Sequence, residues 1–429
     1  MPSPISWAEL RGRRVALWGL GVEGRANLRR TQVLGLEPLL VDDSTEEVDG
    51  RPVARFDEAL PQLLGCEVVV KSPGISRYGE QCRQLTAAGV EVVGGLGLWL
   101  AGADRSRVAC ITGTKGKSTT TSIAGGLLGG LAQRYHLGGN LGSAPWDPEV
   151  GDDFDWWVVE TSSYQALDVV VGPKVVAVTS LSEDHLPWHN GSAETYFQDK
   201  LSLCTRPGVT TVIADAGDPL LQSHRKLLGE HVHWVERGAS EWSQNGALLG
   251  EHNRRNAEIA REVLVALGVP GADDEQALAA AFAAFTPLPH RLTPVAEGDG
   301  VLFVDDSIST NALSALAAVD SFPGRRVALL VGGLDRDIDY RPLADGLAGR
   351  ADLLVVTMPT NGPTIGGLLA GRVAVQQCSS LEEATRAGHA WAKQGGGVVV
   401  LSPAAASFDL FADYQARGEA FAQAARQLV

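Results

Sequence analysis

The chain has 429 residues and a formal net charge of −15 at pH 7. This length predicts two to three domains, and an acidic chain without a block of lysines and arginines argues against nucleic acid or an anionic membrane as a partner. Five cysteines are scattered without a C-x-x-C pair, which predicts neither a disulfide framework nor a zinc site. We expect a cytoplasmic protein without a secretory signal or a membrane-spanning segment.

Short apolar runs alternate with helical patterns along most of the chain, which predicts α/β domains with largely parallel sheets. A loop over residues 101–107 and a proline-containing segment over residues 283–300 interrupt this alternation. We therefore predict three α/β domains, at residues 1–103, 104–287 and 288–429.

The first motif along the chain is GLGVEG at residues 19–24, which follows a predicted strand and precedes Asp42 and Asp43 at the end of the next strand. This pattern is typical of a dinucleotide site, where glycines admit a pyrophosphate and an acidic residue holds a ribose hydroxyl. The alternatives are a different diphosphate ligand and a tight turn without a ligand. An SPGI turn at residues 72–75 follows another strand and belongs to the same sheet edge.

The strongest local signal is ACITGTKGKSTTTSIA at residues 109–124, where an apolar strand leads through glycines into a helix. Free N–H groups and the dipole at a helix N-terminus favour an anion. Gly113 and Gly116 admit phosphate oxygens, and Lys117 can reach a terminal phosphate. The general phosphate-loop pattern has glycine where this chain has Ile111, and the alternative is a simple connecting turn. We predict a nucleotide-phosphate site, with Mg²⁺ held by Ser118 or Thr119.

An acidic residue and a histidine pair follow the phosphate loop. Glu160 ends the apolar strand WWVVE, a usual place for a Mg²⁺ ligand, and the alternative is a solvated glutamate. His185 and His189 are four residues apart, but Pro187 between them makes a zinc site on a helix improbable.

Three further segments are ambiguous by themselves. Lys200 lies beside aromatic residues and is compatible with a surface lysine that buries only its stem. Asn253 and Asn256 precede a helical run and could be an ordinary helix start. Arg291 stands at a predicted domain junction, where its guanidinium could reach a phosphate.

Taken together and in this order, the motifs resemble the Mur ligase family, ATP-dependent enzymes that add amino acids in peptidoglycan synthesis. The series GTKGKST, VVETSSYQ, SEDH, YFQDK, HNRRN, PHR, DDSISTN and SPAAASFD spans nearly the whole chain. The short N-terminal domain and the ending SPAAASFDLFADYQARG are most similar to the glutamate-adding members, which act on UDP-N-acetylmuramoyl-L-alanine.

The resemblance implies a Rossmann-like UDP-sugar-binding domain, a central ATP-binding P-loop domain and a Rossmann-like amino-acid-binding domain. We expect a monomer. It implies a reaction in which ATP phosphorylates the substrate carboxylate and the amine of glutamate attacks the acyl phosphate. ATP and Mg²⁺ are the implied cofactors. The glycine motif of the first domain would then bind a uridine diphosphate, at Gly19, Leu20, Gly21, Gly24, Asp42, Ser72, Pro73, Gly74 and Asn140.

The same resemblance assigns roles in catalysis. The implied ATP contacts are Gly113, Thr114, Lys115, Gly116, Lys117, Ser118, Thr119, Asn256, Arg291 and Asp306. The implied catalytic residues are Lys117, Glu160, His185, Lys200 and Asp306. The implied metal ligands are Ser118, Glu160, His185 and Lys200, the last as a carbamate formed with CO₂.

Two positions depart from the pattern of the members that add D-glutamate. In DSISTN, Ile308 replaces a lysine, and in GGLDRDIDY, Arg336 replaces a lysine between Asp335 and Asp337. Exchanging a point charge for a planar guanidinium should re-aim the γ-carboxylate, and both changes resemble the subfamily that adds L-glutamate. We expect L-glutamate, with D-glutamate as the alternative. The implied glutamate contacts are Thr310, Arg336, Ser407, Phe408 and Tyr414.

Other functions are compatible with parts of the pattern. A folylpolyglutamate synthase also uses ATP and a carbamylated lysine, but the first domain and the SPAAASFD ending disfavour this function. A non-catalytic regulator is disfavoured by the intact Lys117, Glu160, His185 and Lys200. An NAD-dependent oxidoreductase with an accessory ATPase domain is the third alternative.

Overall fold

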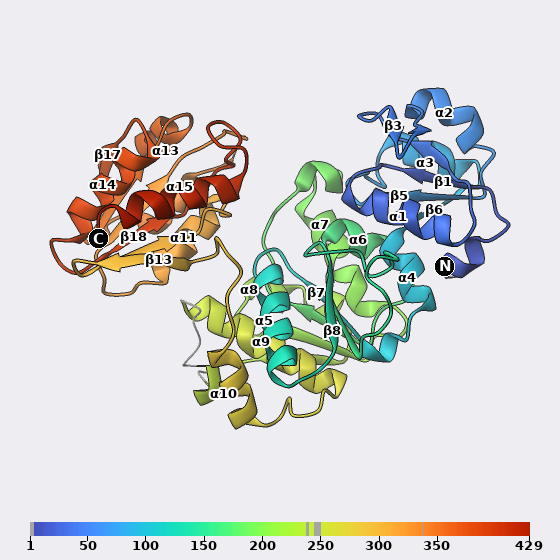
Figure 1. Cartoon of the computed structure of the whole chain (residues 1–429), viewed down its shortest axis with the longest axis horizontal. Coiled ribbons are helices and arrows are strands. Elements are labelled where there is room, and N and C mark those ends of the chain that lie inside the picture. The colour runs from blue at the N-terminus through green and yellow to red at the C-terminus, as the bar shows by residue number, and fades with distance from the viewer. Residues whose placement is uncertain (1–3, 237–239, 244–249, 337) are drawn as a thin grey trace. The chain divides into compact units, whose positions relative to one another are not determined.

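The computed structural model describes residues 4–236, 240–243, 250–336 and 338–429 (Figure 1). The chain divides into two compact units, one formed by residues 1–246 and 255–285 and the other by residues 247–254 and 286–429. Each unit combines helices with mainly parallel sheets, which confirms the predicted α/β class. The three-domain boundaries at residues 103 and 287 stay a prediction.

The first unit contains a small parallel sheet near the N-terminus, with the strand order β2-β1-β5-β6. Its apolar central strands are buried along their whole length, as expected for a sheet covered on both faces. The strands are β1 Val15–Trp18, β2 Leu39–Val41, β5 Val68–Lys71 and β6 Glu91–Gly94, with a separate pair β3 Glu47–Val48 and β4 Arg51–Pro52. The helices are α1 Val22–Val33, α2 Phe56–Leu63, α3 Glu80–Ala87 and α4 Gly95–Gly102.

A six-stranded parallel sheet in the order β12-β11-β10-β7-β9-β8 forms the rest of the first unit. Its strands are β7 Val108–Thr112, β8 Tyr135–Gly139, β9 Trp156–Glu160, β10 Val175–Val178, β11 Thr211–Asp215 and β12 Val232–Val235. Its helices are α5 Lys117–Gly130, α6 Ser163–Asp168, α7 Ala193–Leu201, α8 Pro219–Ser223, α9 Glu251–Leu267 and α10 Glu275–Ala283. Because β7 and β9 are parallel neighbours, the phosphate loop and Glu160 come to the same edge.

Polar contacts join the two sheets of the first unit. The ammonium group of Lys71, at the end of β5, lies 2.6 Å from Asp168 Oδ2 at the end of α6, and Lys71 is fully buried. Arg77 pairs with the other oxygen of Asp168. Gln165 Nε2 donates to Glu23 Oε2 over 2.9 Å, which connects α6 to the glycine loop of α1.

The second unit has a six-stranded sheet in the order β13-β14-β18-β15-β16-β17, in which β13 runs antiparallel to β14 and the other described pairs are parallel. Its strands are β13 Thr293–Gly298, β14 Val301–Asp305, β15 Val327–Val331, β16 Leu353–Thr357, β17 Ala374–Gln377 and β18 Val398–Leu401. Its helices are α11 Ala312–Asp320, α12 Arg341–Leu347, α13 Gly362–Leu369, α14 Leu381–Ala392 and α15 Tyr414–Arg426.

Some local predictions were wrong. The segment over residues 283–300, predicted as a boundary, contains the division between the two units after residue 285 but also holds a strand that was not predicted. This strand, β13, has half-buried, mixed residues that pair with β14 instead of a continuous apolar run. The predicted loop at residues 101–107 holds the end of α4 and a 3₁₀ turn at Arg105–Arg107. The motif HNRRN lies inside α9 and does not precede it. Strands β8, β12 and β17 each lie at the edge of a sheet and were not predicted from the sequence.

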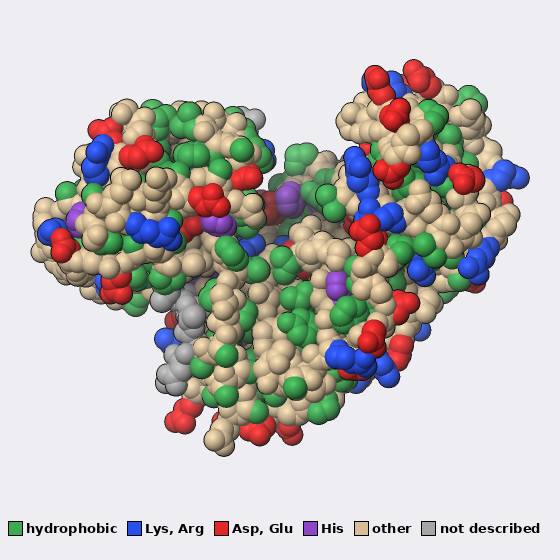
Figure 2. Space-filling model, in the orientation of Figure 1, with side chains coloured by type: hydrophobic (Ala, Val, Ile, Leu, Met, Phe, Trp, Pro, Cys, Tyr) green, Lys and Arg blue, Asp and Glu red, His purple; other side chains and the backbone are tan. Residues whose placement is uncertain are grey.

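Charged side chains of both signs are interspersed over the face of the molecule in view (Figure 2). Within the described residues, none of the helices combines the length and apolar character that crossing a membrane requires.

Candidate active site

The phosphate loop connects β7 to α5 at the carboxyl edge of the central sheet. Gly116 is the residue before α5 and has φ +88°, in the left-handed region that glycine adopts readily. A Cβ atom there would lie 2.7 Å from Asn256 Oδ1, so the amide of α9 packs directly against the loop. Thr114 N donates to Ser180 O over 2.8 Å, and Lys115 N to Ser180 Oγ over 2.9 Å, which anchors the loop to the segment after β10.

Two lysines converge on one carbonyl oxygen of this loop. Lys117 Nζ donates to Gly113 O over 2.9 Å and to Thr114 O over 3.0 Å. Lys200 Nζ donates to the same Gly113 O over 2.9 Å. Lys200 is 2% exposed, so the surface-lysine alternative was wrong. Burial, followed by the positive charge of Lys117, lowers the pKa of Lys200 well below its ordinary value.

Glu160 is the last residue of β9 and is 1% exposed, so the solvated-glutamate alternative was also wrong. Asn140 Nδ2 donates to Glu160 Oε1 over 2.8 Å. The other oxygen, Oε2, is buried and makes no hydrogen bond within the described part of the chain. A buried carboxylate oxygen normally has a partner, so Glu160 presents an acceptor that a bound group can complete. Asn140 thus lies beside Glu160, on the central sheet.

His185 directly precedes the 3₁₀ turn Leu186–His189 and has φ +52°, in the left-handed region. Its side chain is 55% exposed, and its Nε2 lies 3.8 Å from Asp184 Oδ1. Asp184 in turn approaches Lys115, with 3.3 Å between Oδ2 and Nζ. Burial lowers the pKa of His185 although Asp184 opposes this, and the nearby lysines lower it further. The neutral imidazole that results is the form that can bind a metal.

A buried chain of polar groups that the sequence analysis did not identify supports α7, which carries Lys200. Tyr78 OH lies 2.8 Å from Asp199 Oδ1, and Asp199 Oδ2 lies 2.6 Å from His189 Nδ1. His189 Nε2 lies 3.0 Å from Ser163 Oγ, at the start of α6. His189 is therefore fully buried in a structural network, and Asp199 precedes Lys200 directly.

The residues predicted to bind the UDP-sugar gather at the carboxyl edge of the small sheet, apart from Asn140. Gly19 has φ +88°, and a Cβ atom there would lie 2.7 Å from Ser72 Cβ. Ser72 Oγ donates to Gly19 O over 2.7 Å, and Leu20 N donates to Asp42 Oδ2 over 2.6 Å. These contacts fix the glycine loop, which continues through Gly21 and Gly24 into α1, against the turn that contains Pro73 and Gly74.

In the second unit, Asp306 follows β14 and is 8% exposed. Ser402 Oγ donates to Asp306 Oδ2 over 2.6 Å. Burial raises the pKa of Asp306 to about 7, against the hydrogen bond from Ser402 and the charge of Arg291, which lower it. The predicted ATP contacts Asp306 and Arg291 therefore influence each other electrostatically.

The residues predicted to contact glutamate also lie in the second unit. The guanidinium carbon of Arg336 lies 5.5 Å from the ring centre of Phe408, within the range of a cation–π contact. Both side chains are exposed, whereas Ser407 is buried. Thr310 is exposed before α11, and Tyr414 begins α15. Asp337 lies outside the described residues.

Arg417 is a structural residue of this region that the sequence analysis missed. It is 1% exposed and donates to Ser307 O over 2.8 Å, to Ala405 O over 2.9 Å and to Ala406 O over 3.2 Å. Burial lowers its pKa to about 10. Arg417 thereby ties the turn after Asp306 to the turn that carries Ser407.

The predicted metal ligands supply only part of the oxygen donors that Mg²⁺ needs. Among the described residues, no group of three or more His, Cys, Asp and Glu side chains is arranged to hold a metal ion. The free Oε2 of Glu160 is a hard oxygen donor of the kind Mg²⁺ prefers. Mg²⁺ usually keeps waters and takes substrate phosphate oxygens as further ligands, so a sparse donor set beside a phosphate loop is compatible with it.

Comparison with known proteins decides the family. Residues 111–284 match the Mur ligase middle domain, and residues 290–405 match the Mur ligase glutamate ligase domain. The chain belongs to the Mur ligase family. Mur ligases are ATP-dependent enzymes that form amide bonds, and this protein is a ligase of that class.

Full-length relatives have a consistent description. UDP-N-acetylmuramoyl-L-alanine–L-glutamate ligase from Xanthomonas euvesicatoria pv. vesicatoria is 40% identical, over 97% of this chain and 96% of that protein. The enzyme of the same name from Micromonospora sp. is 37% identical, over 98% of each chain. Both alignments thus extend over nearly the full length of this chain and of the relative.

Solved structures confirm the fold. A UDP-N-acetylmuramate–alanine ligase from Thermotoga maritima covers 97% of this chain and 100% of its own, with a TM-score of 0.56 and 15% identity. A pseudomurein peptide ligase type C from Methanothermus fervidus has the same coverage, with a TM-score of 0.59 and 13% identity. A folylpolyglutamate synthase from Mycobacterium tuberculosis covers 76% of this chain, with a TM-score of 0.53.

Proposed function

We propose that this Mur ligase joins glutamate to the carboxylate of UDP-N-acetylmuramoyl-L-alanine at the expense of ATP. Its relatives carry that substrate in their names. The observation that carries the proposal is the convergence of the phosphate loop, Lys117, Lys200 and Glu160 at one sheet edge. A carboxylate becomes an electrophile only after a good leaving group is attached. Transfer of a phosphoryl group to it needs positive charge, which Lys117 and a metal ion held by Glu160 would supply.

The residues of the first unit would divide the work as follows. The phosphate loop from Gly113 to Thr119 would hold the β- and γ-phosphates, with Lys117 neutralising charge as the γ-phosphoryl group moves. Asn256 packs against Gly116 and would contact the nucleotide. The glycine loop at residues 19–24, with Asp42 and Ser72, would hold the UDP-sugar at the carboxyl edge of the small sheet.

Mg²⁺ would be held by Glu160, Ser118 and His185 together with phosphate oxygens, and it would supply charge neutralisation at the transferred phosphate. The unpartnered Oε2 of Glu160 is the feature that favours this assignment. His185 would contribute the neutral imidazole that its lowered pKa provides.

Lys200 would act as a carbamate. Only a neutral amine adds to CO₂, and burial beside Lys117 lowers the pKa of Lys200 and so favours that neutral form. The carbamate converts a cation into an anion, which would remove the repulsion between two lysines on one carbonyl oxygen. It would then support the metal near Glu160.

In the second unit, Arg291 and Asp306 would contact ATP, and Thr310, Arg336, Ser407, Phe408 and Tyr414 would form the amino-acid site. We propose that the amino acid is L-glutamate. Arg336 has a planar fork that can bind a carboxylate through two hydrogen bonds, and its stacking near Phe408 orients that fork. Ile308 removes a second cation from the same site.

The five cysteines are free, which fits a reducing compartment, and we propose that the protein acts in the cytoplasm. We also propose that it acts as a monomer.

The reaction is tested by incubating the protein with UDP-N-acetylmuramoyl-L-alanine, ATP, Mg²⁺ and L-glutamate and analysing the nucleotide by mass spectrometry. The proposal predicts a product heavier by one glutamyl residue, formed only when ATP is present. A nucleotide of unchanged mass, while a known glutamate-adding ligase converts the same substrate batch, contradicts it.

The amino-acid preference is tested by changing the two departing positions together, Ile308→Lys with Arg336→Lys. We expect the ratio of rates with L- and D-glutamate to shift towards D-glutamate. Arg341→Lys, at an exposed arginine paired with Asp339, is the matched control and should leave the ratio unchanged. An unchanged ratio in the double variant contradicts the assignment of enantiomer preference to these residues.

A further inference from the structure

A cavity of about 410 Å³ lies in the first unit, at the end of β9 opposite to Glu160. Trp157 is the second residue of β9 and lines the cavity, whereas Glu160 ends the same strand at the phosphate-loop edge. The cavity is therefore separate from the groups assigned to ATP, metal and UDP-sugar.

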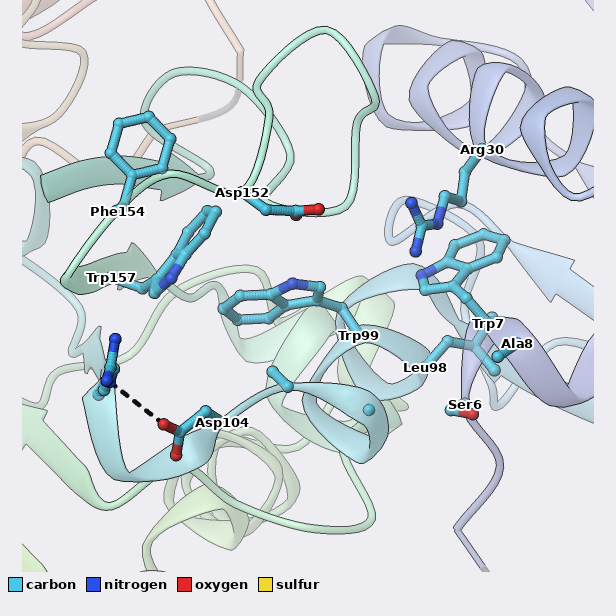
Figure 3. A pocket seen from close by; sticks show the side chains of 13 residues that line it. Ser6, Trp7, Ala8, Arg30, Leu98, Trp99, Asp104, Asp152, Phe154 and Trp157 are labelled. Carbon is cyan, nitrogen blue, oxygen red and sulfur yellow. Dashed lines mark ion pairs between the residues drawn. The ribbon is translucent and has the colours of Figure 1, made fainter.

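Aromatic side chains form the floor of the cavity. The ring centres of Trp99, on α4, and Trp157 are 5.3 Å apart in an edge-to-face arrangement, and Phe154 packs edge-on against Trp157 at 5.2 Å. Figure 3 shows Trp99 lying between Trp157 and Trp7. Trp99 is half-buried, so part of its indole is available as a flat surface.

Two hydrogen-bond donors of the cavity wall lack partners. Arg30 Nε, on α1, is buried and has no hydrogen-bond partner among the described residues, and the guanidinium of Arg30 forms no ion pair with any of them. The indole N–H of Trp99 also makes no hydrogen bond in the described part of the chain, in contrast to that of Trp7, which donates to Gly95 O over 3.2 Å. Figure 3 shows Arg30 extending towards the space above Trp99.

The acidic residues of the cavity limit the charge of a ligand. Asp104 is paired with Arg107, with 3.2 Å between Oδ2 and Nε. Asp152 is exposed, extends towards the cavity from the segment before β9, and has no described partner for its carboxylate. A polyanion such as a nucleotide would meet repulsion from Asp152, whereas a single carboxylate needs only the donors of Arg30 and Trp99.

We propose that this cavity is a binding site for a small aromatic monocarboxylate. The carboxylate pairs with Arg30 and Trp99, and the flat apolar body stacks on the indole of Trp99. An aromatic amino acid offers the same chemistry, with its ammonium group facing Asp152. The inference is independent of the proposed function, because none of its groups belongs to the reaction site.

A structural role for Arg30 has to be separated from binding. Arg30 lies in the last turn of α1, where a cation stabilises the helix through its dipole. That role would affect stability alone and would leave the affinity for a ligand unchanged.

The test measures binding of phenylacetate, phenethylamine and L-phenylalanine to the full-length protein by isothermal titration calorimetry. We expect phenylacetate or L-phenylalanine to bind and phenethylamine to bind at least about tenfold more weakly, since only the carboxylate pairs with Arg30. Tighter binding of phenylalanine than of phenylacetate assigns the ammonium to Asp152, and Asp152→Asn should then abolish the difference. Preferential binding of phenethylamine, or no binding of any probe at 10 mM, overturns the proposal.

Variants locate the site. Arg30→Gln should weaken binding of the carboxylate about tenfold or more, and Trp99→Leu should weaken it through loss of the stacking surface and the N–H donor. Arg25→Gln, at an exposed position of the same helix that does not line the cavity, is the matched control and should bind normally. Circular dichroism verifies the fold of each variant. Undiminished binding in folded Arg30→Gln and Trp99→Leu proteins places the ligand elsewhere and contradicts the inference.

Discussion

The Nζ atom of Lys200 lies 2.9 Å from Gly113 O, and this carbonyl oxygen also accepts a hydrogen bond from Lys117 over 2.9 Å. Two lysine side chains, one of them buried, thus share one acceptor at the phosphate loop. Their surroundings differ, because Lys117 starts α5 and is partly exposed while Lys200 is buried. We therefore expect Lys117 to act as a cation at the transferred phosphate and Lys200 to act as a carbamate.

Lys200→Ala should be nearly inactive and should regain part of its activity when short carboxylic acids such as acetate are added. The acid would replace the carbamate oxygens in the space that the truncation leaves. Phosphate release is the measurement, and Lys226→Ala, at an exposed lysine, is the control that should retain full activity. Rescue by short amines in place of acids would show that Lys200 acts as a plain cation.

Lys117→Ala should lower phosphate release by about 100-fold or more while leaving the fold intact, because it removes charge stabilisation at the transferred phosphoryl group and little packing. Steady-state phosphate release and circular dichroism check the two parts of this expectation. Near-normal turnover by a folded Lys117→Ala protein would exclude the lysine from the reaction.

Asp168→Asn should destabilise the protein more than Lys71→Met. The first change leaves the fully buried ammonium of Lys71 without a neutralising charge, at a cost of about 3–5 kcal/mol. The second change leaves Asp168 paired with Arg77 and should cost less. Urea unfolding monitored by tryptophan fluorescence gives both values, and the reverse order of destabilisation would contradict the role assigned to Asp168.

Glu23→Gln should stabilise the protein at pH 8 and have little effect near pH 4. Burial raises the pKa of Glu23 from 4.5 to about 7 in the folded state, so the folded protein retains a proton that the unfolded chain loses. Stability therefore falls as pH rises from about 4.5 to about 7, and above that the buried charge costs up to about 3 kcal/mol. The amide removes this cost.

Unfolding free energies measured across the pH range test this expectation. Glu67→Gln, at an exposed carboxyl group, provides the comparison. Parallel stability curves for Glu23→Gln and the unchanged protein would show that the carboxyl of Glu23 is ionised at little cost.

The sequence predicted what local patterns encode. The pattern around residues 109–124 predicted the strand, glycine turn and helix that the structure shows, and the position of Glu160 at a strand end predicted its place beside that turn. The burial of Lys200, the network of Tyr78, Asp199 and His189, and the triple hydrogen bonding of Arg417 could not be predicted, because each depends on contacts between segments far apart in the chain. Strand β13 was missed because its antiparallel edge position allows mixed polar and apolar residues.

The most direct test of the account compares phosphate release with L-glutamate and D-glutamate at equal concentration, with UDP-N-acetylmuramoyl-L-alanine and saturating ATP and Mg²⁺. The account predicts release that depends on both the nucleotide-sugar and glutamate and that is faster with L-glutamate. Faster release with D-glutamate would contradict the assigned enantiomer, and no glutamate-dependent release with either one would contradict the proposed reaction itself.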